Sequence, residues 1–201
     1  MSHYDIAVAG TGLTGLALAA ALRDSGLTIV LLDVHAPTGS SFEIKPEQSA
    51  HVVKSGVPVR VSAINQRSMA FLTRIAGAPV AAAPYSHMHV WDQMGSAQIA
   101  FDAADAGCSE LGFIVPNSAM SNVLVAALEA AADVDIRTGE VTSCNRQDGA
   151  MCIGLAEGDA VTADLVIGAD GASSAIRRMA GLRTFERNDG QRALVTTVML
   201  D

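Results

Sequence analysis

The stretch YDIAVAGTGLTGLALAAALRDSGLTIVLLD, residues 4–33, decides the fold. An apolar run at residues 6–9 predicts a buried strand, and the segment that follows the glycines predicts a helix to about Ser25. A second apolar run, residues 27–33, predicts another strand. The order of strand, glycine-rich turn, helix and strand therefore predicts a βαβ unit with parallel strands.

The three glycines of this turn have different physical roles. Gly10 lets the chain turn sharply off the strand, Gly12 lets the backbone approach a pyrophosphate, and Gly15 lets the helix pack closely on the strand. Leu13 and Thr14 lie between the last two glycines, where the amides of the helix start face an anion. These five residues form the predicted phosphate-binding turn.

Asp33 supplies the acidic group that a dinucleotide site needs. It stands 18 residues after Gly15, at the tip of the second strand, where its carboxylate can accept both ribose hydroxyls of an adenosine. An unmodified ribose is favoured over a 2′-phosphate. Glycines also serve ordinary turns and helix contacts, but the complete order of elements favours dinucleotide binding.

Composition limits the function classes. The chain has 201 residues, of which 50% are hydrophobic, and a net charge of −8. Its 13 Lys and Arg residues are scattered, which argues against a nucleic-acid partner. No apolar run has the length of about 20 residues that a transmembrane helix needs, and the segment MSHYDIAV lacks the charged leader of a signal peptide. We expect a globular, cytoplasmic protein.

The cysteines and histidines do not predict a metal site. Cys108, Cys144 and Cys152 lack metal-type spacing, suit a reducing compartment and are interpreted as small core residues. His87 and His89 would share one face of a strand, but no third ligand is close in sequence. A half-exposed strand face is the favoured interpretation.

A polar, irregular connection at residues 34–58 follows the βαβ unit, and its length is typical of functional or mobile loops. Arg60 stands just after it, and spacing alone favours a solvated arginine. Ser62 is a candidate cap for a helix whose apolar positions recur at helical spacing. These positions are Ile64, Met69, Leu72 and Ile75.

The later part of the chain predicts mainly strands. Residues 85–101 predict a β-hairpin broken at Gly95, and Asn117 or Ser118 is expected to cap a helix that ends before Asp133. A three-stranded β-meander follows, with Asp-Gly and Glu-Gly turns. Its predicted strands are residues 140–145, 150–155 and 161–167, and its turns are residues 148–149 and 157–158.

A second candidate nucleotide-binding position follows the last meander strand. Asp170 and Gly171 stand at the strand end and precede a short helix that contains Arg177 and Arg178. An acid at a strand end, flanked by glycines and followed by a helix, can hold a ribose or a phosphate.

Four segments together resemble the FAD-dependent aromatic hydroxylases. They are GTGLTG with Asp33, RVSAI at residues 60–64, LGFIVPN at residues 111–117, and ADLVIGADGASSAIRR at residues 163–178. Within that family the chain resembles the ubiquinone-biosynthesis monooxygenases, which hydroxylate polyprenylated phenols and benzoquinols. The resemblance covers nearly the whole chain but only the N-terminal half of the family fold.

The resemblance implies an α/β fold of α+β character. It comprises a Rossmann-like FAD-binding βαβ domain with a three-stranded β-meander, plus an incomplete β-rich substrate domain. Residues 1–83 and 115–182 would form the discontinuous FAD-binding domain, and residues 84–114 and 183–201 would supply substrate-domain strands.

The resemblance also assigns the cofactor, FAD, with NAD(P)H as reductant. Reduced flavin would react with dioxygen, and the C4a-hydroperoxide would deliver one oxygen atom to the ring, so no catalytic side chain is predicted. The implied cofactor contacts are Gly10, Gly12, Leu13, Thr14 and Gly15 at the pyrophosphate, Asp33 at the adenosine ribose, Arg60 from its loop, Asn117 beside the flavin, Val141 at the adenine, and Asp170 with Gly171.

Family members are about twice as long as this chain, and a later Gly-Asp segment completes their cofactor site. We therefore expect an inactive fragment that binds FAD weakly or is isolated without it. The final run, residues 193–200, predicts an unpaired strand, and we expect self-association. The resemblance also implies a polyprenylated substrate, a biosynthetic protein assembly and a location peripheral to the inner membrane.

Two other function classes stay open. An NAD-dependent dehydrogenase would keep the βαβ unit, but it would alternate strands and helices after Asp33 instead of forming a hairpin and a meander. A non-catalytic dinucleotide-binding partner in a biosynthetic assembly would need only a suitable surface.

Overall fold

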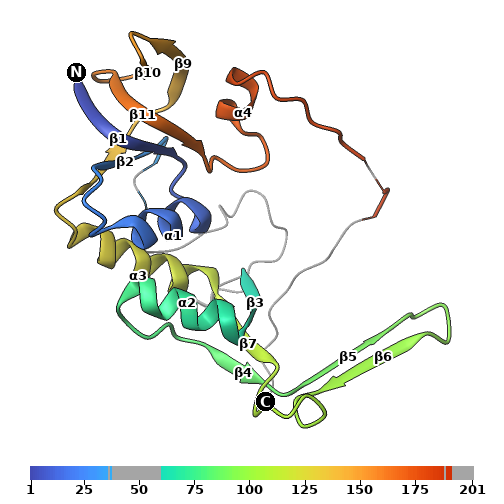
Figure 1. Cartoon of the computed structure of the whole chain (residues 1–201). Helices are drawn as coiled ribbons and strands as arrows, with labels where there is room; N and C mark the ends of the chain where they lie inside the picture. Colours follow the sequence, from blue (N-terminus) through green and yellow to red (C-terminus); the bar gives the residue numbers. More distant parts are fainter. Residues whose placement is uncertain (36, 38–59, 188, 192–201) are drawn as a thin grey trace, which may run out of the picture.

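The computed structural model describes residues 1–35, 37, 60–187 and 189–191. A six-stranded sheet with helices on one face forms the main body, and a hairpin projects away from it (Figure 1). The strand order of the sheet is β8-β2-β1-β11-β10-β9. Its strands are β1 (Ser2–Ala9), β2 (Ile29–Asp33), β8 (Val134–Thr138), β9 (Val141–Gln147), β10 (Ala150–Leu155) and β11 (Val161–Gly168).

Four neighbouring strands of this sheet are parallel, and this arrangement creates the edge at which a ligand can bind. Strands β8, β2, β1 and β11 pair in parallel, whereas β10 and β9 add to them antiparallel. Ala9 pairs with both Leu32 and Gly168, so β1, β2 and β11 end at the same edge. Ligands of open α/β sheets bind outside this carboxyl edge.

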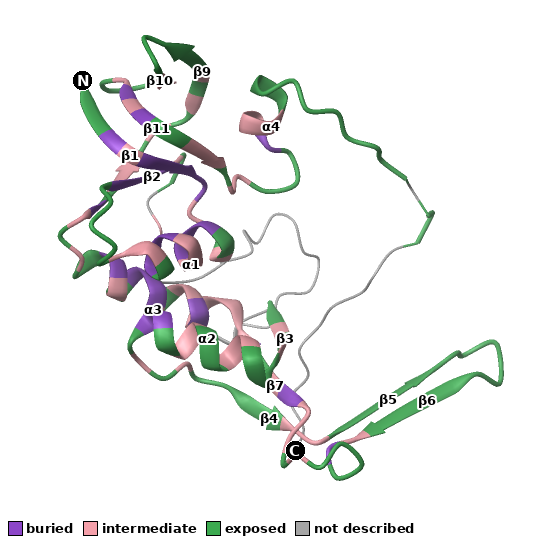
Figure 2. Cartoon of the chain, viewed as in Figure 1, coloured by how far each residue is buried: buried purple, intermediate pink, exposed green. Residues whose placement is uncertain are grey.

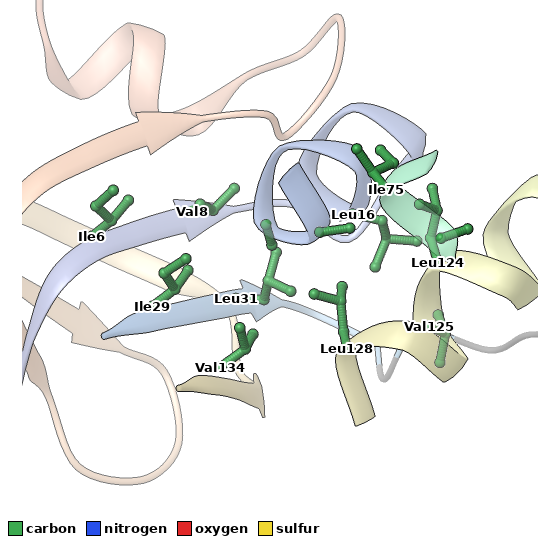
Figure 3. Packing of buried hydrophobic residues seen from close by; sticks show 13 residues of the cluster. Ile6, Val8, Leu16, Ile29, Leu31, Ile75, Leu124, Val125, Leu128 and Val134 are labelled. Atoms are coloured by element: carbon green, nitrogen blue, oxygen red, sulfur yellow. The ribbon is translucent and has the colours of Figure 1, made fainter. Parts of the chain in front are cut away.

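Helices α1 (Leu13–Leu22) and α3 (Asn117–Glu129) lie on one face of the sheet, and α2 (Gln66–Ala76) packs against these two helices (Figure 1). Figure 3 shows Leu16, Leu124 and Leu128 of these helices packed against Ile29 and Leu31 of β2. Val30 and Leu32 of β2 belong to a second cluster, which includes meander residues. Because β2 is buried on both faces, its sequence is continuously apolar instead of alternating.

Two small sheets complete the structure. One has the order β3-β7-β4 and consists of β3 (Val61–Asn65), β7 (Gly112–Pro116) and β4 (Ala83–Tyr85). The other is the hairpin of β5 (His87–Trp91) and β6 (Gln98–Asp102). Figure 2 shows that this hairpin is exposed along almost its whole length.

The predicted α/β architecture is confirmed. The βαβ unit, the 87–102 hairpin and the meander all form, and the short helix α4 (Ala175–Met179) follows the last meander strand. At the first meander turn, Asp148 and Gly149 have φ angles of 51° and 92°. Both are left-handed, as a two-residue hairpin turn of Asp-Gly type requires.

The predicted helix cap at Ser62 is wrong. Residues 61–65 form strand β3 instead, and α2 begins at Gln66, one residue after its cap Asn65. The Asn65 Oδ1 atom accepts a hydrogen bond from the Ser68 amide at 2.8 Å. The strand forms because β3 pairs antiparallel with β7, a partner about fifty residues away that local spacing does not reveal.

The predicted cap of α3 is also wrong. Pro116 occupies the N-cap position and makes no side-chain cap hydrogen bond, and Asn117 is the first helical residue. The Asn117 Oδ1 atom instead accepts a hydrogen bond from the Ser62 hydroxyl at 2.7 Å. Asn117 therefore ties the start of α3 to β3.

Other expectations need smaller corrections. Strand β8 was not predicted, although it pairs with β2 throughout the length of β2. Cys108, Cys144 and Cys152 are partly buried and free, so they are not fully buried core residues. The predicted domain boundaries fall inside β4 and β7, and the domain division stays a prediction. Most of the 34–58 connection and the 193–200 run lie outside the described residues.

Candidate functional site

The glycine turn between β1 and α1 packs directly against the turn that follows β11. Gly10 has a φ angle of +107°, and a β-carbon there would overlap the carbonyl of Ala169 and lie 2.8 Å from the amide nitrogen of Asp170. The Gly10 amide donates to the Leu32 carbonyl at 2.7 Å, and the Ala169 amide donates to the Ala9 carbonyl at 2.7 Å. Only glycine fits this close crossing of two backbones.

The other two glycines differ in their surroundings. A β-carbon at Gly15 would overlap the carbonyl oxygen of Gly10, so Gly15 is needed for the contact between helix and turn. A β-carbon at Gly12 would meet no described atom within 4 Å. Gly12 caps α1 without a side-chain hydrogen bond, which leaves the first helical amides open to an anion.

Asp33 is fixed to the glycine turn. Its Oδ2 atom accepts hydrogen bonds from the Thr11 amide at 2.6 Å and the Thr11 hydroxyl at 2.7 Å. Among the described residues, its Oδ1 atom accepts a long hydrogen bond of 3.4 Å from the His35 amide. Oδ1 therefore keeps capacity for a ligand hydroxyl, while Oδ2 holds the end of β2 against the turn.

Asp170 has the same division between its two carboxylate oxygens. Its Oδ2 atom accepts hydrogen bonds from the amides of Ala175 at 2.6 Å and Ile176 at 3.1 Å. Its Oδ1 atom is buried and has no hydrogen-bond partner among the described residues. A buried oxygen of this kind needs a partner, and a ligand hydroxyl would supply one.

Hydrogen bonds keep both carboxyl groups charged. Burial raises the pKa of Asp33, but the Thr11 hydrogen bonds and nearby amides outweigh burial and hold the pKa below its usual range. Burial also raises the pKa of Asp170, where the Ser174 hydroxyl and nearby amides likewise produce a net lowering. Both groups are therefore carboxylates, hydrogen-bond acceptors only, at neutral pH.

A cleft of about 460 Å³ lies between these groups at the carboxyl edge of the sheet. It is lined by Ala9, Gly10, Gly12, Leu32, Asp33, Val34, Gly139, Glu140, Val141, Ala169, Asp170, Gly171, Ser173, Ala175 and Arg178. The βαβ turn, the β2 end, the start of the meander and the turn after β11 therefore form one site.

Six of the predicted site residues line this cleft: Gly10, Gly12, Asp33, Val141, Asp170 and Gly171. Leu13, Thr14 and Gly15 begin α1 directly behind the turn. Arg60 and Asn117 are not among the lining residues, and they meet each other elsewhere, where the Asn117 amide donates to the Arg60 carbonyl at 3.0 Å. The cofactor contacts assigned to all eleven residues stay predictions.

Sequence reasoning missed part of the lining. Glu140 and Gly139 follow β8, which was not predicted, and the Gly139 amide donates to the Asp33 carbonyl at 2.7 Å. Ser173 and Arg178 follow the Asp170-Gly171 pair, where the sequence alone does not say which side chain faces the cleft. The alternation of VDIRT at residues 134–138 was the available signal for β8.

The site residues fit the adenosine and diphosphate parts of a dinucleotide. The open helix start at Gly12 suits a diphosphate, whose oxygens accept hydrogen bonds from amides. Asp33 Oδ1 and the unpaired Asp170 Oδ1 are acceptors suited to sugar hydroxyls. Small residues elsewhere in the lining leave space for the ligand.

The histidines of the hairpin, His87 and His89, contact other residues of the same hairpin. His87 Nε2 lies 2.8 Å from Asp102 Oδ2, and the His89 ring lies 5.2 Å from that of Trp91. Within the part of the chain that the structure describes, no group of three or more His, Cys, Asp or Glu side chains has a metal-binding arrangement.

The described helices include none with the length and apolar character to cross a membrane.

Acid should weaken the fold through these carboxylates. Because the folded-state pKa of Asp33 lies below the unfolded value of about 3.9, Asp33 stabilises the fold above that pH, and the contribution is lost as pH falls through the folded pKa. Urea unfolding of wild type and Asp33→Asn at about pH 6 and about pH 3 measures this. We expect the free energy of unfolding to fall less between the two pH values in the variant than in wild type. Equal falls would contradict a stabilising role of the Asp33 carboxylate.

Comparisons with known proteins identify the family of the chain. Residues 3–201 match the family described as FAD binding domain. The chain is 31% identical over 202 residues to 3-demethoxyubiquinol 3-hydroxylase of Escherichia coli, covering 98% of this chain and 49% of that protein. It is 27% identical over 213 residues to the mitochondrial ubiquinone biosynthesis monooxygenase of Rattus norvegicus, covering 99% and 43%. The chain thus spans about half the length of these relatives.

A solved structure has the same fold. The flavin-dependent monooxygenase PieE, crystallised with FAD and substrate, superimposes with a TM-score of 0.64 at 19% identity, over 89% of this chain and 32% of that chain. Because the family match covers nearly the whole sequence, this chain belongs to the FAD binding domain family, whose cofactor is FAD.

Proposed function

We propose that this chain is the cofactor-binding half of a flavin-dependent aromatic hydroxylase that acts on a polyprenylated phenol or benzoquinol in ubiquinone biosynthesis. The carrying observation is the cleft that joins the open start of α1 to the acceptors Asp33 and Asp170. Similarity to the hydroxylase of Escherichia coli supports the substrate class. Bound FAD, reduced by NAD(P)H, supplies oxygen transfer from dioxygen to an electron-rich ring.

The residues of this chain bind and orient the cofactor. Amides at the Gly12 turn donate to the diphosphate, and Asp33 Oδ1 accepts from the adenosine ribose. Asp170 Oδ1 accepts from a further cofactor hydroxyl, because its other oxygen is already used by backbone amides. Thr11 keeps the Asp33 carboxylate aimed by bonding to Oδ2.

In this proposal Arg60 reaches the cofactor from its loop, and Asn117 lies beside the flavin. They meet where β3 and α3 begin, and the hydroxyl of Ser62 holds the Asn117 side chain. Both residues lie outside the lining of the described cleft, so any contact that they make is with a part of the cofactor that extends beyond it. No side chain of this chain is assigned a proton-transfer step.

The exposed hairpin offers a surface for partners. One face of the hairpin carries Met88, Val90, Ile99 and Phe101, each between 37% and 51% exposed. Such an apolar face supports further contacts, either with the remainder of a longer protein or with another copy of the chain. We propose that the protein joins a biosynthetic protein assembly and that it is cytoplasmic, in a location peripheral to the inner membrane.

Two other functions are less well supported. An NAD-dependent dehydrogenase would share the βαβ unit, but the match to the FAD binding domain family favours flavin. A non-catalytic dinucleotide-binding role in an assembly uses the same cleft and differs only in turnover. Oxygen transfer therefore has to be measured, because cofactor binding alone does not distinguish the non-catalytic role from hydroxylation.

FAD binding tests the proposal. We expect the 201-residue chain to quench FAD fluorescence only weakly, because relatives are about twice as long, whereas a full-length version should purify with stoichiometric flavin. The full-length protein should then hydroxylate a polyprenylphenol with NAD(P)H and dioxygen. Tight NAD binding without flavin would overturn the proposal, and flavin binding without hydroxylation would favour the non-catalytic role.

A further inference from the structure

The cleft has an unusual balance of charge for a site that receives a diphosphate. Asp33, Glu140 and Asp170 bring carboxylates to its lining. The pKa values of Asp33 and Asp170 are lowered, so both repel phosphate oxygens at neutral pH. Among the described residues that line the cleft, Arg178 alone carries a positive side chain.

The guanidinium of Arg178 is held in position but is not neutralised. Its Nη1 atom donates to the Ser173 carbonyl at 2.5 Å, and Ser173 also lines the cleft. No carboxylate among the described residues lies within the 4 Å of an ion pair with Arg178. A guanidinium has five N–H donors, so most of them stay available for an anion.

The neighbouring arginine has a different role. Arg177 is half-buried, does not line the cleft and donates from Nη2 to the Ala172 carbonyl at 2.7 Å. It therefore holds the turn that leads into α4. Two adjacent arginines thus differ in position, and only Arg178 borders the space available to a ligand.

We propose that Arg178 binds the diphosphate of the FAD that occupies this cleft, together with the open helix start at Gly12, which lines the same cleft. This inference rests on the proposed function, because it takes FAD as the occupant. The amides near Gly12 supply directional hydrogen bonds, and Arg178 supplies the full positive charge that offsets the lining carboxylates. The Ser173 hydrogen bond preorganises the guanidinium for this contact.

Titrations with parts of the cofactor test this role in the ¹⁵N-labelled chain by NMR. ADP contains the diphosphate and adenosine does not, so the two ligands separate the phosphate contact from the rest of the site. We expect Arg178→Gln to weaken ADP binding about tenfold and to leave adenosine binding unchanged. Arg178→Lys should lose less, and Arg183→Gln, an exposed arginine that does not line the cleft, should match wild type.

Salt gives a second measurement, because a contact between exposed charges weakens as ionic strength rises. ADP affinity should fall with salt more steeply in wild type than in Arg178→Gln. Equal ADP affinities in the two proteins, or equal losses for ADP and adenosine, would overturn the assignment. A wild-type chain that binds NADH more tightly than FAD or ADP would instead contradict the proposed function.

Discussion

Gly10→Ala is expected to lower the free energy of unfolding by about 3 kcal/mol or more. The φ angle of +107° is strained for alanine, and the new β-carbon would overlap the Ala169 carbonyl. Relief would require β1 and β11 to separate at the edge where Ala169 donates to Ala9. Urea unfolding followed by circular dichroism measures the change.

Gly12→Ser is the matched control for this experiment. Gly12 has φ and ψ of −68° and 174°, and a β-carbon there meets nothing within 4 Å. Serine is a favourable N-cap residue, so the stability of Gly12→Ser should equal or exceed that of wild type. Its FAD affinity should nevertheless fall, because the side chain would occupy the approach to the helix amides. Equal stabilities for Gly10→Ala and Gly12→Ser would contradict this account of the turn.

Asp33→Ala in the proposed longer protein is expected to weaken FAD binding by about 1.5–3 kcal/mol, the amount typical of a hydrogen bond to a charged group. In the proposed site the lost contact is the one between Asp33 Oδ1 and the adenosine ribose, because Oδ2 already accepts from Thr11. FAD dissociation constants from fluorescence titration measure the difference. Unchanged FAD affinity would remove Asp33 from the site.

Thr11→Val separates this direct contact from an indirect effect on the turn. The variant loses the hydroxyl that donates to Asp33 at 2.7 Å but keeps the amide that donates at 2.6 Å. The carboxylate should therefore stay near its position, and FAD affinity should change by less than in Asp33→Ala. A loss equal to that of Asp33→Ala would assign the whole effect to the shape of the turn.

Local signals explain why much of the fold was predictable. The glycine turn needs Gly10 whatever surrounds it, because its left-handed backbone disfavours other residues. The meander turn at Asp148-Gly149 fixes the register of β9 and β10 within a few residues. The apolar run of β2 is long enough to be recognised as a buried strand.

Elements that depend on distant partners were hard to predict, because local signals such as the alternation at residues 134–138 do not show which strand they pair with. Residues 61–65 form strand β3 because they pair with β7. Asn117, which follows β7, accepts a hydrogen bond from Ser62 of β3 and is not the helix cap that the sequence predicts. Strand β8 adds to the sheet only beside β2, which lies about a hundred residues earlier. In each case the deciding hydrogen bonds cross between segments that no sequence window contains.

The sequence by itself determined the βαβ unit, its glycines and the acid at Asp33, because turn conformation and periodicity are local properties of the chain. Only the tertiary structure decided which groups share the cleft. It brought Asp170 and Arg178 to the edge that Gly10 crosses, engaged one oxygen of Asp33 with Thr11, and kept Arg60 outside the lining. The physical reason is that parallel pairing of β1 with β2 and β11 joins strand ends far apart in sequence.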